Sequence, residues 1–194
     1  MRYRTGEGEL IPIIVLILTN VVVYIAIYAT SLAGNNILPY LALSRSTFFT
    51  YPWTLVSYMF THEGFFHLLF NMLTLYFFGS FLNRITGLKY FLLVYFIGGV
   101  LAGLVILLLS PAYTFTVGAS GAIFALGGAL AVITPRLKVF VFPIPAPMPL
   151  WVAILIGFLV LALVPGVSWQ GHLGGLLFGL LSGWYLRSRL RVII

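Results

Sequence analysis

The sequence predicts an all-α polytopic membrane protein built from six transmembrane helices. Of its 194 residues, 62% are hydrophobic and only 7% are charged, whereas soluble domains carry about 25% charged residues. A water-soluble fold of this size buries only about 60–70% of the surface that its unfolded chain exposes. Such a fold could not hide this much apolar surface, so lipid is the expected solvent.

Six apolar segments account for most of the chain. A helix needs about 20 apolar residues to cross a bilayer, and we expect spans at about 10–29, 67–82, 88–109, 121–134, 149–164 and 171–186. The fourth is short for a full crossing unless its start lies inside the protein, below the membrane surface. Such a start is tolerated only where protein or a water-filled cavity satisfies the backbone. We treat residues 1–194 as one membrane domain, since neither a repeat nor a soluble domain is evident.

The first segment also resembles a signal peptide. Arg2 and Arg4 precede it, and Ser31-Leu32-Ala33 has the small residues of a cleavage site. However, its apolar run is about 20 residues long, whereas signal-peptide cores have about 7–15. We therefore expect a retained membrane anchor.

The remaining stretches of sequence are expected to be loops. Residues 31–62 form the longest, which is too polar to span the membrane but apolar enough to lie at its interface. Residues 142–149 (FPIPAPMP) form a proline-rich connector that cannot be helical throughout.

The distribution of Lys and Arg predicts the orientation. If the six spans are correct, Arg45 alone lies on one side, and nine basic residues lie on the other: Arg2, Arg4, Arg84, Lys89, Arg136, Lys138, Arg187, Arg189 and Arg191. Cytoplasmic loops carry the excess of basic residues, so we expect both termini in the cytoplasm of a cell whose plasma membrane holds the chain. The pI near 9.9 follows from the same residues, so we expect a lipid bilayer as partner and no nucleic acid.

Polar residues gather at one depth of the predicted bundle. The second, fourth and sixth spans all start at the external side if both termini are cytoplasmic. His67 and Asn71 open the second span (HLLFN), Ser120 opens the fourth (GASGAI), and His172 opens the sixth (GHLGG). Polar side chains inside a membrane are costly and commonly functional, so these four residues are the candidate site.

Small residues recur every four positions on two spans: Gly171, Gly175, Gly179 and Gly183 on the sixth, and Gly121, Ala125 and Ala129 on the fourth. Such ridges let helix backbones approach closely. If the two ridges face each other, Ser120 and His172 lie beside matching ends of the contact. The spacing then predicts a serine–histidine pair within hydrogen-bonding reach.

This pair has the chemistry of a nucleophile and its base. A serine hydroxyl attacks a carbonyl once a base such as His172 takes its proton. The free N–H groups at a helix N-terminus favour a developing negative charge near Ser120, and His67 and Asn71 share a helix face from which both can donate hydrogen bonds. Together with the Ser120 N–H they could form an oxyanion hole. The chain has no Asp, and Glu63 is the only acid beyond the N-terminal tail, so a dyad is expected rather than a triad.

Each of these residues also has a plainer interpretation. A serine among glycines commonly serves packing, an intramembrane histidine can simply bond a carbonyl, and Asn71 can join two helices. A metal site is disfavoured because only three histidines are present (His62, His67 and His172), with no Cys or Asp. We expect neither a metal nor another cofactor.

At these residues the sequence resembles the rhomboid family of intramembrane serine proteases, in its minimal six-span prokaryotic form, over about residues 10–187. The family's Gly-x-Ser-x motif matches residues 118–121 (GASG). Its histidine followed by spaced glycines matches His172, Gly175 and Gly179, and its His-x-x-x-Asn motif, with a further histidine upstream, matches His62, His67 and Asn71.

The resemblance implies a Ser120–His172 catalytic dyad in a water-filled cavity open to the external side, with His67, Asn71 and the Ser120 N–H as the oxyanion hole. Gly118, Phe124 and His62 would support this site. The substrate would be the transmembrane segment of another protein, entering past the fifth span beneath residues 165–170 and cut at a small residue. Residues 31–62 would form the family's membrane-embedded hairpin.

Two positions depart from the family's pattern. Phe124 stands where the family often has a tyrosine that stacks on the catalytic histidine, and Trp53-Thr54 stands where it has Trp-Arg. The second departure concerns how the loop is anchored. A non-catalytic rhomboid-like protein that binds membrane clients stays open as an alternative, as does a small transporter or channel. The sequence does not indicate an oligomeric state.

Overall fold

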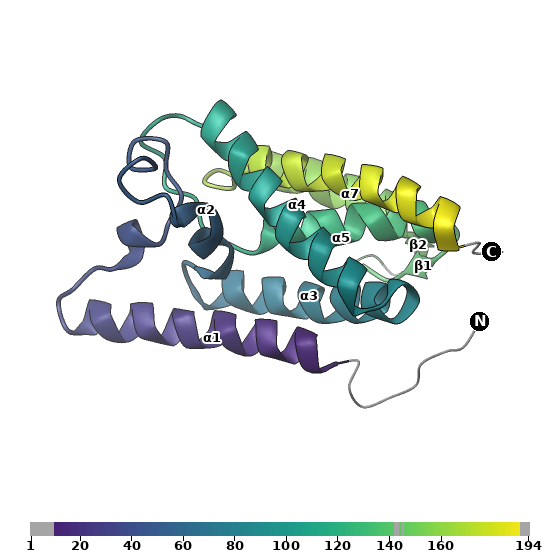
Figure 1. The fold of residues 1–194 in the computed structure, drawn as a ribbon, viewed down its shortest axis with the longest axis horizontal. Coiled ribbons are helices and arrows are strands. Elements are labelled where there is room, and N and C mark those ends of the chain that lie inside the picture. Colours follow the sequence, from purple (N-terminus) through teal and green to yellow (C-terminus); the bar gives the residue numbers. More distant parts are fainter. Residues whose placement is uncertain (1–9, 142–143, 145, 191–194) are drawn as a thin grey trace.

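The computed structural model describes residues 10–141, 144 and 146–190. Each of the six expected spans corresponds to one long helix (Figure 1), namely α1 (Ile11–Leu32), α3 (Phe65–Thr86), α4 (Leu88–Leu109), α5 (Ser120–Ile133), α6 (Leu150–Ala162) and α7 (Trp169–Leu190). α3 and α7 are longer than the expected 67–82 and 171–186. Polar residues continue both helices at their C-terminal ends, and both begin two residues earlier, at Phe65 and Trp169. α6 begins one residue later than the expected 149–164, with Pro149 at its N-cap, and ends two residues earlier, at Ala162.

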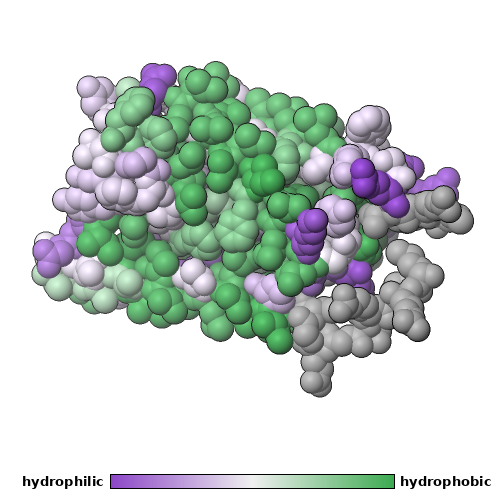
Figure 2. Space-filling model, in the orientation of Figure 1, coloured by the Kyte–Doolittle hydropathy of each residue, from purple (hydrophilic) through white to green (hydrophobic). Residues whose placement is uncertain are grey.

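The described helices are apolar on the outside. Figure 2 shows hydrophobic residues covering the middle of the molecule and hydrophilic ones gathered toward two opposite ends. Three described helices, α1, α3 and α4, are long and apolar enough to cross a membrane, and α5 and α6 are shorter apolar helices. The chain is therefore an all-α polytopic membrane protein.

α5 forms the centre of the bundle. Nearly all of its residues are buried, and it packs against α3, α4, α6 and α7. With 14 residues it rises only about 21 Å, which is less than the hydrocarbon core of about 30 Å. One end of α5 therefore lies within the depth of the membrane, where surrounding protein must satisfy its backbone.

The small-residue ridges of α5 and α7 face each other, as their spacing predicts. A Cβ atom added at Gly175 would overlap the carbonyl oxygen of Gly121. The same relationship joins Gly179 to the carbonyl of Ala125, and Gly183 to that of Ala129. Contact this close between two backbones requires glycine on one side.

Gly171 fits the expected ridge only in part. A Cβ added there would meet the Ile106 side chain of α4 at 2.8 Å, so its open side faces α4, while its carbonyl oxygen lies 3.4 Å from the position of a Cβ on Gly121 of α5. The first turn of α7 is wedged between two helices, and the four-residue period does not show which of them a given glycine meets.

Residues 33–64 connect α1 to α3 through three short helices, η2 (Leu38–Tyr40), α2 (Thr54–Ser57) and η3 (Tyr58–Phe60). Two backbone hydrogen bonds of 2.9 and 2.8 Å pair Leu43 with Thr116. Beside them, the N–H of Ser46 donates to the carbonyl of Ala112 at 2.9 Å. The connection is thus fastened to the segment that leads from α4 into α5.

A small antiparallel pair of strands adds to the expected helices. β1 (Lys138–Val139) pairs with β2 (Met148–Pro149) at the turn between α5 and α6. The proline-rich connector 142–149 contributes β2, while its residues 142, 143 and 145 lie outside the described residues.

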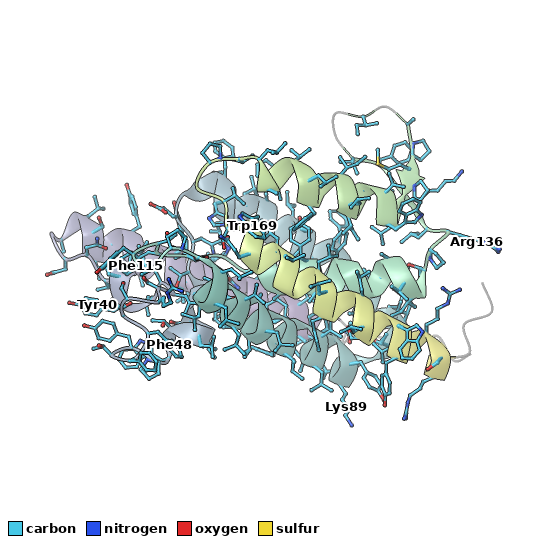
Figure 3. The ribbon with its side chains drawn as sticks, turned by 90° about the horizontal axis from the view of Figure 1, so that it is seen from above. Tyr40, Phe48, Lys89, Phe115, Arg136 and Trp169 are labelled. Carbon is cyan, nitrogen blue, oxygen red and sulfur yellow. The ribbon has the colours of Figure 1, made fainter. Side chains whose placement is uncertain are left out.

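The two ends of the bundle differ in the residues that gather there, although neither kind is confined to one end, since Arg45 lies beside Phe48 and Arg189 lies over the Tyr185 ring. Figure 3 shows Lys89 and Arg136 toward one end, Tyr40, Phe48 and Phe115 toward the other, and Trp169 nearer the middle. We call these the basic end and the aromatic end. Arg187 belongs to the basic end, because its Nη1 donates to the carbonyl of Val132 in the last turn of α5 at 3.1 Å. Arg2, Arg4 and Arg191 of the orientation argument lie outside the described residues.

Candidate active site

Ser120 is the first residue of α5, at the aromatic end. The chain turns into the helix at Gly118, whose φ of 120° is unfavourable for any residue with a side chain. The N–H of Gly118 donates to the carbonyl of Tyr58 at 2.9 Å, which fixes the turn against η3. The first N–H groups of a helix have no partner within it, so Ser120 sits among backbone donors.

His172 lies within hydrogen-bonding distance of Ser120, as the glycine spacing predicts. Its Nε2 is 2.9 Å from the Ser120 Oγ, and the histidine is only 4% exposed. The two residues come from helices that touch through their backbones at Gly121 and Gly175. The close helix contact therefore sets the distance between the two side chains.

Phe124 covers the His172 ring. The two ring centroids are 4.5 Å apart and the planes are tilted by 30°, so phenylalanine stacks here without a hydroxyl group. The Nδ1 atom of His172 is buried and has no hydrogen-bond partner among the described residues. Within the part of the chain that the structure describes, the arrangement is thus a pair and not a triad.

His67 reaches the turn before Ser120. A Cβ atom at Gly118 would lie 2.7 Å from the Nε2 of His67, so this imidazole occupies the space that the glycine leaves free. Asn71 lies one turn further along α3, and its Nδ2 donates to the His67 carbonyl at 2.8 Å. That bond uses one of two amide hydrogens and also holds the backbone of His67.

His62 supports the same turn from the other side. The Ala119 N–H donates to the His62 Nε2 over a long 3.5 Å, and the rings of His62 and His67 meet edge to face at 5.0 Å. Burial, together with the neighbouring His67, lowers the pKa of His62 to about 3. The ring therefore stays neutral near pH 7 and can accept a hydrogen bond.

Tyr58 was not among the residues that sequence reasoning selected. It is 1% exposed, and its hydroxyl donates to the carbonyl of Gly99 on α4 at 2.6 Å. Burial raises its pKa well above the usual range, so the hydroxyl keeps its proton. Because its carbonyl also accepts from Gly118, Tyr58 joins α4 to the turn before Ser120. No local sequence signal distinguishes it from the other aromatic residues of its loop.

The site thus holds a hydroxyl, a base and a set of hydrogen-bond donors at one helix N-terminus. These are the parts that acyl transfer needs: a nucleophile, a proton acceptor and stabilisation for an oxyanion. The fold and the site together define a class, the helical membrane proteins that bury a serine–histidine pair within the bundle.

The rhomboid domain family matches residues 50–189, and the chain belongs to the rhomboid family. It is 31% identical to the mitochondrial Rhomboid protein 1 of Saccharomyces cerevisiae over 155 residues, which cover 74% of this chain and 44% of that protein. It is 35% identical to the rhomboid protease GluP of Bacillus subtilis over 128 residues, which cover 66% of this chain and 24% of GluP.

A further relative is the putative rhomboid protease YdcA of Bacillus subtilis, which is 41% identical over 76 residues, or 39% of this chain and 38% of YdcA. The chain thus spans less than half the length of these three curated relatives. Family membership supports intramembrane serine protease activity in general.

Proposed function

We propose that this protein is an intramembrane serine endopeptidase in which Ser120 is the nucleophile and His172 the general base. One observation carries the proposal: the 2.9 Å contact between the Ser120 Oγ and the His172 Nε2 at the N-terminus of α5. Membership of a family that includes proteases supports it.

The protonation states that this contact requires of Ser120 and His172 fit this role. For the Ser120 hydroxyl to donate, the Nε2 of His172 must be the unprotonated nitrogen, which leaves the hydrogen on Nδ1. As Ser120 Oγ bonds to the scissile carbonyl carbon, its proton moves to Nε2 and the carbonyl oxygen becomes an oxyanion. His172 then gives that proton to the leaving amine as the peptide C–N bond breaks.

Water completes the reaction. It attacks the acyl-enzyme ester with His172 again as base, the new acid leaves, and the Ser120 Oγ regains a proton. A hydrolysis of this kind needs no metal and no cofactor, in agreement with the donor set that the sequence offers.

The oxyanion would be held by the Ser120 N–H, His67 and Asn71. His67 is supported by its contact with the turn at Gly118. Asn71 is supported by its second amide hydrogen, which its bond to the His67 carbonyl does not use. Gly118, His62 and Phe124 would act through these groups, by shaping the turn or orienting the rings.

Transmembrane segments of other proteins are the proposed substrates, and they would enter beside α6. The packing of α6 supports this route, because only Leu150 and Ile154 are buried along its 13 residues. A loosely packed helix can move aside at low cost. The expected loop 165–170 is shorter in the structure, because Trp169 and Gln170 already belong to α7. The segment before α7 would lie above the entrance, and a water-filled cavity would surround the dyad.

The proposed setting is the plasma membrane, with both termini in the cytoplasm and the site toward the external side. Lys89 and Arg136 lie at the end of the bundle away from Phe115 (Figure 3), which precedes the turn into Ser120, and this supports the orientation.

The test is cleavage of a single-span substrate protein in liposomes by the purified protein and its Ser120→Ala variant. Ser182→Ala is the matched control, because among the described residues that hydroxyl donates to the Gly179 carbonyl of its own helix. We expect cleavage, and labelling by a fluorophosphonate, in the wild type and the control but not in Ser120→Ala. Labelling that survives Ser120→Ala would remove Ser120 as nucleophile. Binding of the substrate without cleavage by any form would favour the client-binding alternative.

A further inference from the structure

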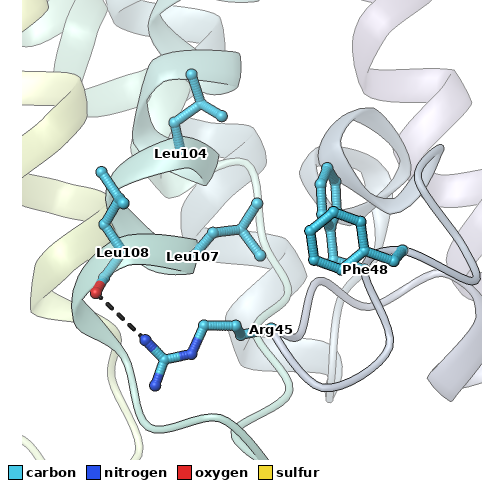
Figure 4. Close-up of a pocket in the computed structure, with 6 residues that line it drawn as sticks. Arg45, Phe48, Leu104, Leu107 and Leu108 are labelled. Carbon is cyan, nitrogen blue, oxygen red and sulfur yellow. Dashed lines mark hydrogen bonds between the residues drawn. The ribbon is translucent and has the colours of Figure 1, made fainter.

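An apolar groove lies at the aromatic end, between the first loop and the last turns of α4. It encloses about 330 Å³ and is lined by Arg45, Phe48, Phe49, Leu104, Leu107 and Leu108. Figure 4 shows Phe48 facing the leucines of α4, with Arg45 across the mouth of the groove. Arg45 is the single polar residue among the six.

Arg45 brings a positive charge that the described protein does not neutralise. One of its N–H groups points to the carbonyl of Leu108 at 3.5 Å (Figure 4), and a guanidinium has five such donors. Glu63 is the only carboxylate in the part of the chain that the structure describes, and it forms no ion pair there with Arg45. Arg45 is also exposed, so most of its donors face outward.

The charge sits at the edge of the apolar zone. Leu108 lies next to the last residue of α4, Leu109, and Leu104 lies one turn deeper. Phe49 is 92% exposed, as suits a ring immersed in lipid. Apolar side chains below and a cation above reproduce the order of layers in one leaflet, where acyl chains lie beneath a plane of phosphates.

The groove is separate from the proposed substrate route. That route lies beside α6, whereas the groove is formed by α4 and residues 45–49. The loop side of the groove, residues 45–49, directly follows Leu43 and Ser44, which fasten the connection to the segment before α5: the Ser44 Oγ donates to the carbonyl of Ala112 at 2.9 Å, and Leu43 pairs with Thr116.

We propose that this groove binds one glycerophospholipid molecule. Its phosphate accepts hydrogen bonds from the Arg45 guanidinium, which suits the bidentate geometry of phosphate oxygens. One acyl chain lies along Leu104 and Leu107, between Phe48 and α4. The bound lipid would fasten the first loop to the end of α4. This inference does not depend on proteolytic activity.

The test uses phosphatidylglycerol with a photoreactive group in its acyl chain, added to the purified protein in neutral detergent micelles. Crosslinked peptides are identified by mass spectrometry. Arg45→Gln removes the cation, and Leu108→Trp fills the groove at an exposed position while Arg45 stays. Lys89→Gln is the matched control, since it also removes one positive charge, but from the opposite end of α4, which forms the other wall of the groove. Thermal unfolding of each variant shows that it is folded.

We expect crosslinks on residues 45–49 and 104–108, reduced about fivefold or more by Arg45→Gln and by Leu108→Trp, and unchanged by Lys89→Gln. Unlabelled phosphatidylglycerol should compete, whereas dioleoylglycerol, which lacks the phosphate, should not. Equal crosslinking of wild type and Arg45→Gln would overturn the proposal, leaving only ordinary boundary lipid. Displacement by a single-span peptide but not by phosphatidylglycerol would overturn it in favour of a protein-docking surface.

Discussion

Gly175 of α7 packs against the carbonyl oxygen of Gly121 of α5, so closely that a Cβ atom at Gly175 would overlap this oxygen. Gly121 directly follows Ser120, and Gly175 lies within one turn of His172. The backbone contact therefore acts as the spacer that brings the hydroxyl and the imidazole together.

Gly175→Ala should separate α5 from α7. We expect it to lower the free energy of unfolding by at least about 1–3 kcal/mol, the usual cost of overpacking, because one of the backbones must shift. Gly157→Ala on α6 is the control, since a Cβ there meets nothing within 4 Å. Denaturant unfolding in detergent measures both. A Gly175→Ala variant of wild-type stability would disprove the spacer role.

Gly118→Ala should displace His67 as well as strain the turn. The new methyl group would lie 2.7 Å from the His67 Nε2 at a φ of 120°. Gly34→Ala separates the two effects, because Gly34 also has a positive φ, of 80°, but open space around it. We expect cleavage of a single-span substrate to be lost in Gly118→Ala and kept in Gly34→Ala. Full activity in both would show that His67 tolerates the shift.

Phe124→Leu should loosen the His172 ring while keeping the site apolar. Stacking of two rings contributes about 0.5–1.5 kcal/mol, so kcat should fall about 2–10-fold with little change in KM. Phe124→Tyr is the conservative control and should retain the wild-type kcat, because its ring can stack in the same way. Equal losses in both variants would mean that volume, and not stacking, is what matters.

Asn71→Ala should weaken catalysis less than Ser120→Ala. Losing one oxyanion donor costs about 3–4 kcal/mol at most, and the Ser120 N–H and His67 remain. The fall should appear in kcat rather than KM, since the oxyanion exists only after attack. Complete inactivation of a folded variant would show instead that Asn71 is needed to hold His67 through its 2.8 Å bond.

Acid should destabilise the fold through His62. Its pKa is about 3 in the folded protein and 6.5 in an ordinary environment, so the unfolded chain binds more protons between these values. Stability is then fully present above about pH 6.5 and falls as the pH drops toward 3, with a slope of up to about 1.4 kcal/mol per pH unit. Thermal unfolding from pH 7 to pH 4 measures this slope. His62→Gln should flatten it, and an unchanged slope would assign it to other groups.

The helices and the serine–histidine contact could be predicted from the sequence, because both depend on patterns within short stretches of the chain. Apolar runs mark α1 and α3 to α7, and the four-residue spacing of Gly175, Gly179 and Gly183 indicates which helix backbone can approach another. The same spacing assigns the open side of Gly171 to the α5 contact, whereas a Cβ there would meet Ile106 of α4. The spacing of glycines along one helix does not show where two helices diverge.

Other features depend on residues far apart in the chain. The pairing of Leu43 with Thr116 and the bonds of Tyr58 to Gly99 and Gly118 follow from how the first loop folds over α4. The strands β1 and β2 have two residues each, too few to show an alternating pattern. The contact between His67 and Gly118 joins two motifs that the sequence presents separately.

The Nδ1 atom of His172 has no hydrogen-bond partner among the described residues, and this affects the catalytic rate that we expect. In the proposed mechanism, the positive charge that His172 gains with the serine proton has no carboxylate at Nδ1 among the described residues, and the burial of that charge raises the barrier of the chemical step. We therefore expect slow turnover. Slow turnover would suit the proposed reaction between two molecules in one lipid bilayer, because confinement to the bilayer raises their effective concentration.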